Sequence, residues 1–377
     1  PSPGGDRACR ILRLRYAPPP DAACAGGASG YFTELILHPP YSDAFYVQVF
    51  EREFTETVWE GHVRAFRYFE AVPSRISYDN TTVAVAQMLG GRQRKLTDGF
   101  LQLQSHYLFE EHFCLAARGN EKGVVEGMVR YTRSNFLVPV PQVRSLDELN
   151  ARLEQSCRDD LKRRLRGQGR RKAELLIEDV ASMRQLPSVA FEASRVQATR
   201  ASNLSRVRFD CNDYSVPVRC AHREVVVKGD CESVRIYHQD QLIAEHRRIW
   251  DKEQVRFDPI HYLALLERKP GALDFARPLE GWNLPQCFGT LRRRLEADHG
   301  SDGIREYIAV LRLLERHSLA RLKVAVNAAL ELGCARRELI EQYLYGDNRE
   351  VGEFQLDGHQ HLKLVKVSCT DPGDYSS

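Results

Sequence analysis

The spacing of hydrophobic residues changes along this chain of 377 residues, and it limits what each part can fold into. From Tyr31 to about residue 140, apolar runs of strand length alternate with stretches whose apolar residues recur at helical spacing. The predicted order is strand, strand, helix, strand, helix, strand, helix. This alternation predicts a mixed α/β layer fold.

The hydrophobic period changes to two between about Pro187 and Trp250. In SRVRFDC, Val207 and Phe209 alternate with charged residues, and turn residues separate further short runs. Several short strands at close spacing predict a small β-barrel. After this stretch, apolar residues recur at helical spacing again.

These patterns divide the chain into six predicted segments. They are an irregular segment (1–30), an α/β domain (31–140), a helical basic connector (141–186), a small β-barrel (187–250), a helical region (251–340) and a tail (341–377). The first segment is rich in Pro, Gly, Ala and Arg and has no sustained period of two or of 3.6. We therefore expect residues 1–30 to be disordered.

Positive charge is concentrated in one short stretch of the connector. Eight basic residues there stand against Asp159 and Asp160, a local excess of six that is larger than the net charge of +3 of the whole chain. They are Arg158, Lys162, Arg163, Arg164, Arg166, Arg170, Arg171 and Lys172. Such a basic block attracts polyanions. A solvated helix face or linker is the alternative interpretation.

The ten cysteines do not form a recognisable framework. No two of them stand at Cys-x-x-Cys spacing, and no paired histidines complete a zinc pattern. This usage predicts reduced thiols in a cytoplasmic protein. No apolar run reaches membrane-spanning length, so we expect no membrane partner.

Two carboxylates are candidates for a shared metal site. Asp79 ends the apolar run SRISYDN, where Asp-Asn is also favourable turn chemistry. Glu126 lies in GNEKGVVEG, where it could equally belong to a charge ladder with Lys122 and Arg130 on a solvated helix face. Three glycines in this helix are costly unless the backbone must approach another group closely. A strand-tip Asp and a helix Glu are hard oxygen ligands that suit Mg²⁺.

Three longer stretches carry a family resemblance. GHVRAFRYFEAVPSRISYDNTTVAV, LQSHYLFEEHFCLAARGNEKGVVEG and FDCNDYSVP resemble the IstA-type transposases of the IS21 family of insertion sequences. The resemblance runs from about Tyr31 to about residue 335. It implies a DDE integrase catalytic core of ribonuclease-H-like α/β fold, followed by a small β-barrel and a helical C-terminal region.

The resemblance also implies roles for individual residues. Asp79 matches the second catalytic acidic residue and Glu126 the third, and together they would bind Mg²⁺ or Mn²⁺, of which an intact relative holds a pair. Asn80 and Lys122 match residues beside the site that contact DNA, and the basic block is assigned to DNA phosphates. The implied partners are transposon-end and target DNA, further copies of the chain on that DNA, and an IstB-type AAA+ ATPase.

The first catalytic Asp of the family is missing. It belongs to a QVDFG-like opening strand, but CRILRLRY holds no acidic residue, and Asp6 and Asp21 lack strand-like surroundings. The amino-terminal helix-turn-helix region of the family is also missing. We interpret residues 1–30 as out-of-frame translation joined to a transposase sequence near Tyr31. Two hypotheses stay open: a DDE transposase damaged in strand transfer, and a catalytically dead truncated copy that only binds DNA or other transposase chains.

Overall fold

The chain forms two compact units in the computed structural model. The structure describes residues 9–16, 32–78, 85–90, 93–113, 127, 130–138, 141–165, 167 and 169–346. The first unit consists of Pro1–Tyr214 with His222–Arg256, and the second of Ser215–Ala221 with Phe257–Ser377.

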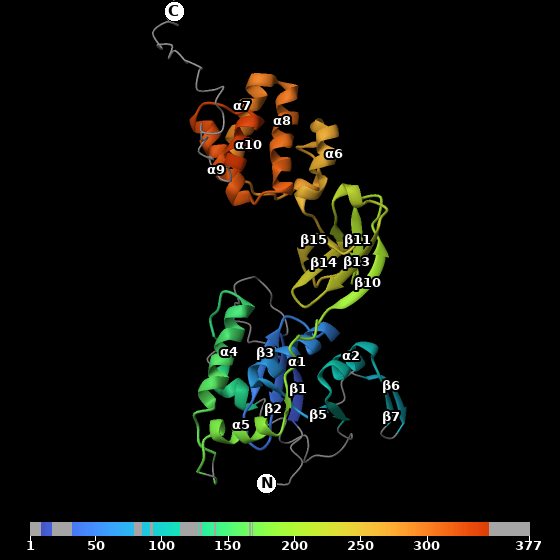
Figure 1. The fold of residues 1–377 in the computed structure, drawn as a ribbon, viewed down its shortest axis with the longest axis vertical. Coiled ribbons are helices and arrows are strands. Elements are labelled where there is room, and N and C mark those ends of the chain that lie inside the picture. Colours follow the sequence, from blue (N-terminus) through green and yellow to red (C-terminus); the bar gives the residue numbers. More distant parts are fainter. Residues whose placement is uncertain are drawn as a thin grey trace, which may run out of the picture. The chain divides into compact units, whose positions relative to one another are not determined.

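A five-stranded mixed sheet is the centre of the first unit (Figure 1). Its strands are β1 (Cys9–Tyr16), β2 (Phe32–His38), β3 (Tyr46–Phe50), β5 (Arg75–Tyr78) and β8 (Glu110–Phe113). They lie in the order β3-β2-β1-β5-β8. β1 pairs antiparallel with β2 and parallel with β5, which in turn pairs parallel with β8. The first unit therefore has the mixed α/β architecture that the sequence predicts.

The central strand β1 corrects the prediction for residues 1–30. Cys9–Tyr16 forms a regular strand between two neighbours, so the expectation of disorder is wrong for this stretch. The sequence shows no clear period there, but β2 and β5 offer backbone hydrogen-bond partners on both edges of the strand. Strand formation here depends on these neighbours more than on local propensity.

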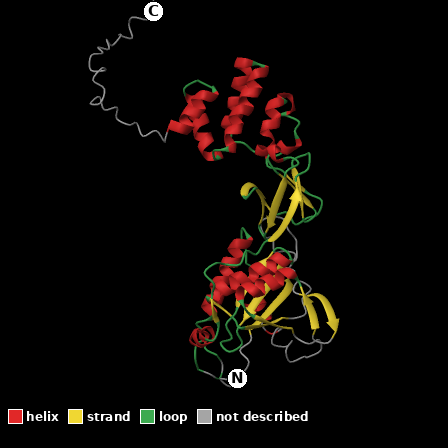
Figure 2. Ribbon diagram, turned by 45° about the vertical axis from the view of Figure 1, so that its right-hand side comes forward, coloured by secondary structure: helices red, strands yellow, loops and turns green. Residues whose placement is uncertain are grey.

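Helices cover both faces of this sheet (Figure 2). On one face, α1 (Thr55–Phe69) and α2 (Asp98–Tyr107) pack Phe66 and Phe100 against Ile76 and Tyr78 of β5. On the other face, α4 (Leu146–Asp160) packs against β2 and β3. Residues 130–136 are also helical and lead to Leu137 in this second core.

The remaining elements of the core are short. A hairpin is formed by β6 (Val85–Gly90) and β7 (Gln93–Leu96). After α4, the connector contains α5 (Lys172–Ala181) and β9 (Arg184–Gln185), and β9 pairs with β4 (Ala71–Val72). The connector is thus hydrogen-bonded to the α/β core.

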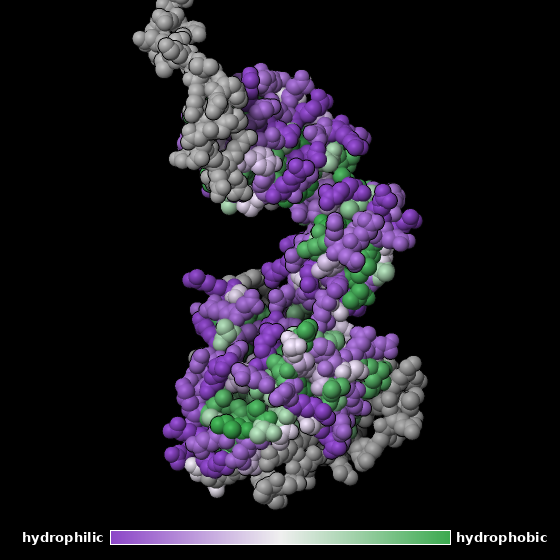
Figure 3. Space-filling view, in the orientation of Figure 1, coloured by the Kyte–Doolittle hydropathy of each residue, from purple (hydrophilic) through white to green (hydrophobic). Residues whose placement is uncertain are grey.

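Residues 195–256, here called the β region, contain two sheets. One consists of β10 (Arg195–Arg200), β13 (Glu224–Gly229), β14 (Ser233–His238) and β15 (Gln241–Arg247). The other consists of β11 (Arg206–Phe209), β12 (Asn212–Ser215) and β16 (Val255–Arg256). Val207, Phe209, Val227 and Ile236 are buried. Figure 3 shows hydrophobic residues among hydrophilic ones on the outer surface of this region. A closed barrel stays a prediction.

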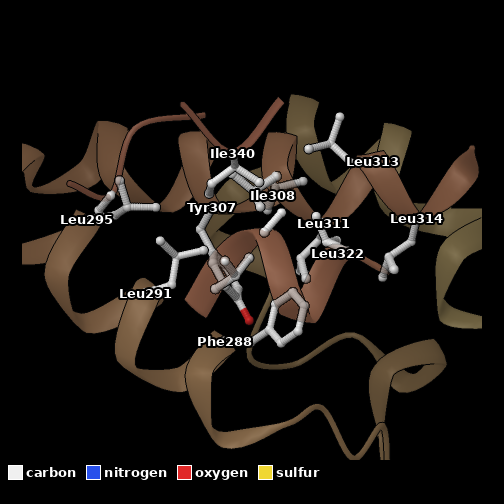
Figure 4. Packing of buried hydrophobic residues seen from close by; sticks show 14 of the residues in the cluster. Phe288, Leu291, Leu295, Tyr307, Ile308, Leu311, Leu313, Leu314, Leu322 and Ile340 are labelled. Atoms are coloured by element: carbon white, nitrogen blue, oxygen red, sulfur yellow. The ribbon is translucent and has the colours of Figure 1, made fainter. Parts of the chain in front are cut away.

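The second unit consists of helices around one apolar core (Figure 4). They are α6 (Leu263–Arg268), α7 (Gln286–His299), α8 (Ser301–Leu311), α9 (Leu319–Glu331) and α10 (Arg337–Gly346). Phe288, Ile308, Leu322 and Ile340 are fully buried in this core. Because α10 runs to Gly346, the helical structure continues beyond the predicted boundary at residue 340. None of the described helices is long and apolar enough to cross a membrane.

Candidate functional site

The candidate metal site begins where β5 ends. Tyr78 is the last residue of β5, which lies between the parallel strands β1 and β8. Asp79 follows Tyr78 directly in the chain. Five of the predicted site residues lie outside the described residues, so their roles stay predictions: they are Asp79, Asn80, Lys122, Glu126 and Arg166.

β1 is the strand next to β5, and it supplies no carboxylate. Ile11 of β1 and Tyr78 of β5 are the last pair in their parallel register. In the sequence, Leu12 is the residue after Ile11, and Asp79 is the residue after Tyr78. Cys9–Tyr16 contains neither Asp nor Glu. In the part of the chain that the structure describes, no cluster of three or more His, Cys, Asp or Glu side chains could hold a metal ion. Among the described residues, β1 therefore offers no carboxylate beside the end of β5.

A buried carboxylate on β2 was not recognised in the sequence. Glu34 is fully buried and lies opposite Leu14 of β1 in the strand register. Its Oε2 is 3.3 Å from Nε of Arg133, while its Oε1 has no hydrogen-bond partner among the described residues. Burial raises the pKa of Glu34, and the nearby Arg133 only partly opposes this effect. The available signal was one acidic residue within the mostly apolar FTELILH strand.

The end of β5 is held from the helix side by His62 of α1. The Nε2 atom of His62 is 2.9 Å from the hydroxyl oxygen of Tyr78, and Nδ1 is 2.7 Å from the carbonyl oxygen of Val58. His62 and Tyr78 are both buried. Burial lowers the pKa of His62 to about 4, so the ring is neutral at neutral pH.

The basic block forms the end of α4, a loop and the start of α5. Arg164 and Arg171 form an antiparallel bridge that closes the loop. Leu165 donates its backbone N–H to the carbonyl oxygen of Arg170. Gly167 and Gly169 both have positive φ, which favours glycine at these positions. The described residues of the basic block therefore do not form one continuous helix face.

Carboxylates neutralise much of this block. Four of its cations are paired locally: Arg158 with Glu154 (2.7 Å), Lys162 with Asp159 (2.6 Å), Arg163 with Asp160 (3.0 Å) and Arg170 with Glu178 (2.6 Å). Arg164 and Arg171 are exposed and form no ion pair with any described residue. The charge available to a polyanion is therefore smaller than the sequence count indicates, and it is concentrated on the loop.

Lys172 differs from the other members of the block. It is only 4% exposed, and its Nζ is 2.8 Å from Asp160 and 2.8 Å from Asp43. Burial alone would raise the pKa of Asp43, but hydrogen bonds from His38 and Lys172 outweigh it and hold that pKa at about 2. Because the ammonium is enclosed, the prediction that Lys172 contacts DNA phosphates does not fit this structure. Sequence spacing could not reveal this burial.

The chain is similar in sequence to several transposases. Residues 186–258 match the family model "Mu transposase, C-terminal domain". A transposase of Aminobacter aminovorans is 33% identical over 86% of this chain. The transposase for insertion sequences IS1326/IS1353 of Pseudomonas aeruginosa is 31% identical over 79% of it, and that for IS21 of the same organism is 31% identical over 55%. The chain is thus similar in sequence to insertion-sequence transposases, including that of IS21.

This chain matches only part of the length of each of these relatives. The chain spans 65%, 59% and 53% of the length of these three proteins, in the same order.

Among solved structures, the HTLV-2 integrase catalytic core in complex with magnesium aligns with 45% of this chain at 11% identity and a TM-score of 0.33. The BIV integrase catalytic core aligns with 46% at 12% identity and a TM-score of 0.33.

Proposed function

We propose that this chain is a DNA transposase of the IS21 type whose strand-transfer site lacks one carboxylate. The observation that carries the proposal is the pairing of β1 with β5 in a chain related to insertion-sequence transposases. Asp79 directly follows β5, and with Glu126 it is the proposed remaining ligand of Mg²⁺ or Mn²⁺. In an intact site these ions would promote phosphoryl transfer between DNA strands.

The composition of β1 makes the chain weak or inactive in strand transfer. A missing carboxylate removes an oxygen ligand and a negative charge from a site that must hold divalent cations. The buried Glu34 does not replace it readily, because Arg133 pairs with its carboxylate. The second candidate function is therefore a protein that binds DNA or other transposase chains without catalysing strand transfer, and the intact basic loop favours it.

The proposed DNA contacts are electrostatic. Arg164 and Arg171 on the exposed loop contact phosphates, as does Lys122, and Asn80 is also assigned to DNA binding by the sequence resemblance. Arg166, which lies on the same loop in sequence, is assigned the same role. Self-assembly on transposon-end and target DNA, and an IstB-type AAA+ ATPase as partner, are further parts of this proposal. They rest on the sequence resemblance to the family.

The register of β1 and β5 indicates how to test the proposal. We would measure Mg²⁺- and Mn²⁺-dependent joining of a matched transposon-end duplex by the chain as given and by its Leu12→Asp variant, which returns a carboxylate to β1. Leu12→Asn is the uncharged control of the same shape. Asp79→Ala in both backgrounds tests the proposed ligand, and a version with a QVDFG-type strand in place of Cys9–Tyr16 tests the whole strand.

The outcomes separate the hypotheses. Joining by the Leu12→Asp chain or the QVDFG version, abolished by Asp79→Ala and absent with Leu12→Asn, supports a transposase with a damaged site. Robust joining by the chain as given, lost in Asp79→Ala, would show that the site is intact and that the proposed loss is wrong. If all versions bind DNA and none joins it, the binding function is favoured. Indifference of every joining version to Asp79→Ala would reject the metal-site assignment.

A further inference from the structure

The hydrogen bond between His62 and Tyr78 is directional. The Nδ1 atom of His62 lies 2.7 Å from the Val58 carbonyl oxygen, which can only accept a hydrogen bond, so Nδ1 carries the proton. In the neutral ring Nε2 is then an acceptor, and the Tyr78 hydroxyl donates to it over 2.9 Å. Both ring nitrogens are thus satisfied, and the position of the Tyr78 hydroxyl is fixed by α1.

This polar pair is enclosed by aromatic rings. Around Tyr78, the ring centroids of Phe100 and Phe113 lie at 5.3 and 5.6 Å, and that of Phe109 lies at 6.5 Å. Phe66 contacts the His62 ring edge-on at 5.8 Å. Two apolar groups of similar shape would pack here at little or no cost in stability. A gain in net stability therefore explains this polar pair poorly. Unlike apolar packing, the hydrogen bond fixes the direction of the Tyr78 hydroxyl relative to His62.

The pair acts at the last registered residue of β5. Tyr78 pairs with Ile11 of β1 on one side and with Phe113 of β8 on the other, and these are the last pairs of both ladders. Its side chain is anchored to α1, an element outside the sheet. Tyr78 is therefore held from three elements, one residue before Asp79 in the chain.

We propose that His62 is a positioning residue, which fixes the end of β5 through Tyr78, the residue that Asp79 follows in the chain. The functional importance of His62 depends on the proposed role of Asp79 as a metal ligand. His62 touches neither DNA nor a metal in this assignment; it acts through the backbone that Asp79 follows. The same bond also couples α1 to the candidate site.

Hydrogen–deuterium exchange in the full chain tests this role. Tyr78→Phe removes only the hydroxyl, whereas His62→Leu removes both its acceptor and the donor to Val58. Each should speed exchange of peptides covering β5 (Arg75–Tyr78) about fivefold. His62→Gln retains an acceptor for Tyr78 and a donor for Val58, so it should restore slow exchange. Tyr107→Phe is the matched control, because Tyr107 is a buried member of the same cluster whose hydroxyl accepts from the backbone N–H of Phe191.

The expected result is selective acceleration in β5 (Arg75–Tyr78) with Tyr78→Phe and His62→Leu, rescued by His62→Gln and absent with Tyr107→Phe. Unchanged exchange there in Tyr78→Phe would overturn the proposal, and so would equal acceleration in all peptides, which indicates general destabilisation. Strand transfer is not needed for this measurement. Failure of both the Leu12→Asp chain and the QVDFG version to join DNA, together with selective acceleration, would reject the proposed function alone. Joining without acceleration would reject the positioning role alone.

Discussion

Arg248 of the β region and Glu56 at the start of α1 form a buried ion pair, with Nη2 and Oε1 3.1 Å apart. Their side chains are 1% and 2% exposed. The guanidinium also lies 2.9 Å from Asp210 and stacks over the Trp250 ring, whose centroid is 4.2 Å from Cζ. Arg195 approaches the same Glu56 carboxylate at 3.3 Å. The β region is thus joined to the α/β core of the first unit by a desolvated charge cluster.

Arg248→Met should destabilise the first unit strongly. Methionine keeps most of the apolar part of the arginine side chain, but it removes the positive charge that pairs with the buried Glu56 carboxylate. Loss of one partner of a buried ion pair typically costs about 3–5 kcal/mol. We expect a large drop in the urea midpoint. Arg52→Met is the matched control, since the Arg52–Asp251 pair joins the same two segments at 2.7 Å with both side chains at least half exposed. It should cost at most about 1 kcal/mol. Equal losses in the two variants would contradict the assignment of Arg248 to the buried joint.

Arg164→Gln with Arg171→Gln should weaken binding to duplex DNA of any sequence. These two exposed arginines have no carboxylate partner among the described residues, so they can neutralise phosphates and release counterions. The slope of log K against log salt should fall in magnitude by about 1 to 2. The control is Arg158→Gln with Lys162→Gln, which removes the same charge from residues already paired with Glu154 and Asp159. A larger effect of the control, or an effect on one sequence only, would refute the loop assignment.

The fold of the first unit could be predicted for those segments whose spacing of apolar residues is characteristic of a strand or a helix. The apolar runs after Tyr31 predicted β2, β3 and β5, and apolar residues at helical spacing predicted α1 and α2. β1 was missed because its stability comes from β2 and β5, which lie far from it in sequence. A local pattern does not contain such partners.

The candidate site shows the same limit for side chains. His62 was recognisable as part of the apolar stripe of α1, but its bond to Tyr78 joins a helix to a strand 16 residues away. In the sequence, Lys172 cannot be distinguished from the other residues of the basic block. In the folded chain, however, Asp43 and Asp160 form ion pairs with its ammonium group. Sequence spacing indicates that charge is present. Which cations face solvent depends on partners that only the folded chain brings together.

The stability of the first unit should fall as the pH is lowered from about 6.5 to about 4. Burial holds the pKa of His62 at about 4 in the folded chain, below its ordinary value of 6.5. In this window the unfolded chain binds a proton that the folded chain excludes, so stability rises with pH and this contribution is complete above pH 6.5. Each pH unit corresponds to about 1.4 kcal/mol.

Urea midpoints measured between pH 4.5 and pH 7.5 would check this dependence. His62→Gln cannot take up the proton and should flatten the profile over the same range. Asp43 contributes in a separate window, because its pKa of about 2 lies below its ordinary value and its stabilisation is lost only as the pH falls below about 4. An identical pH profile in His62→Gln would show that another group is responsible.

Gly303→Ala should destabilise the second unit, although alanine is the better helix former. Gly303 lies in the first turn of α8, and a methyl group there would overlap the carbonyl of Leu295 in α7. The gain in helix propensity is about 1 kcal/mol, whereas forced separation of two packed helices costs about 1–3 kcal/mol, so the clash should decide the sign. Gly289→Ala is the control, because Gly289 is in α7 with nothing within 4 Å of an added methyl group. Thermal unfolding should therefore show opposite shifts, down for Gly303→Ala and up for Gly289→Ala; stabilisation by both would mean that α7 and α8 do not approach as closely as this packing requires.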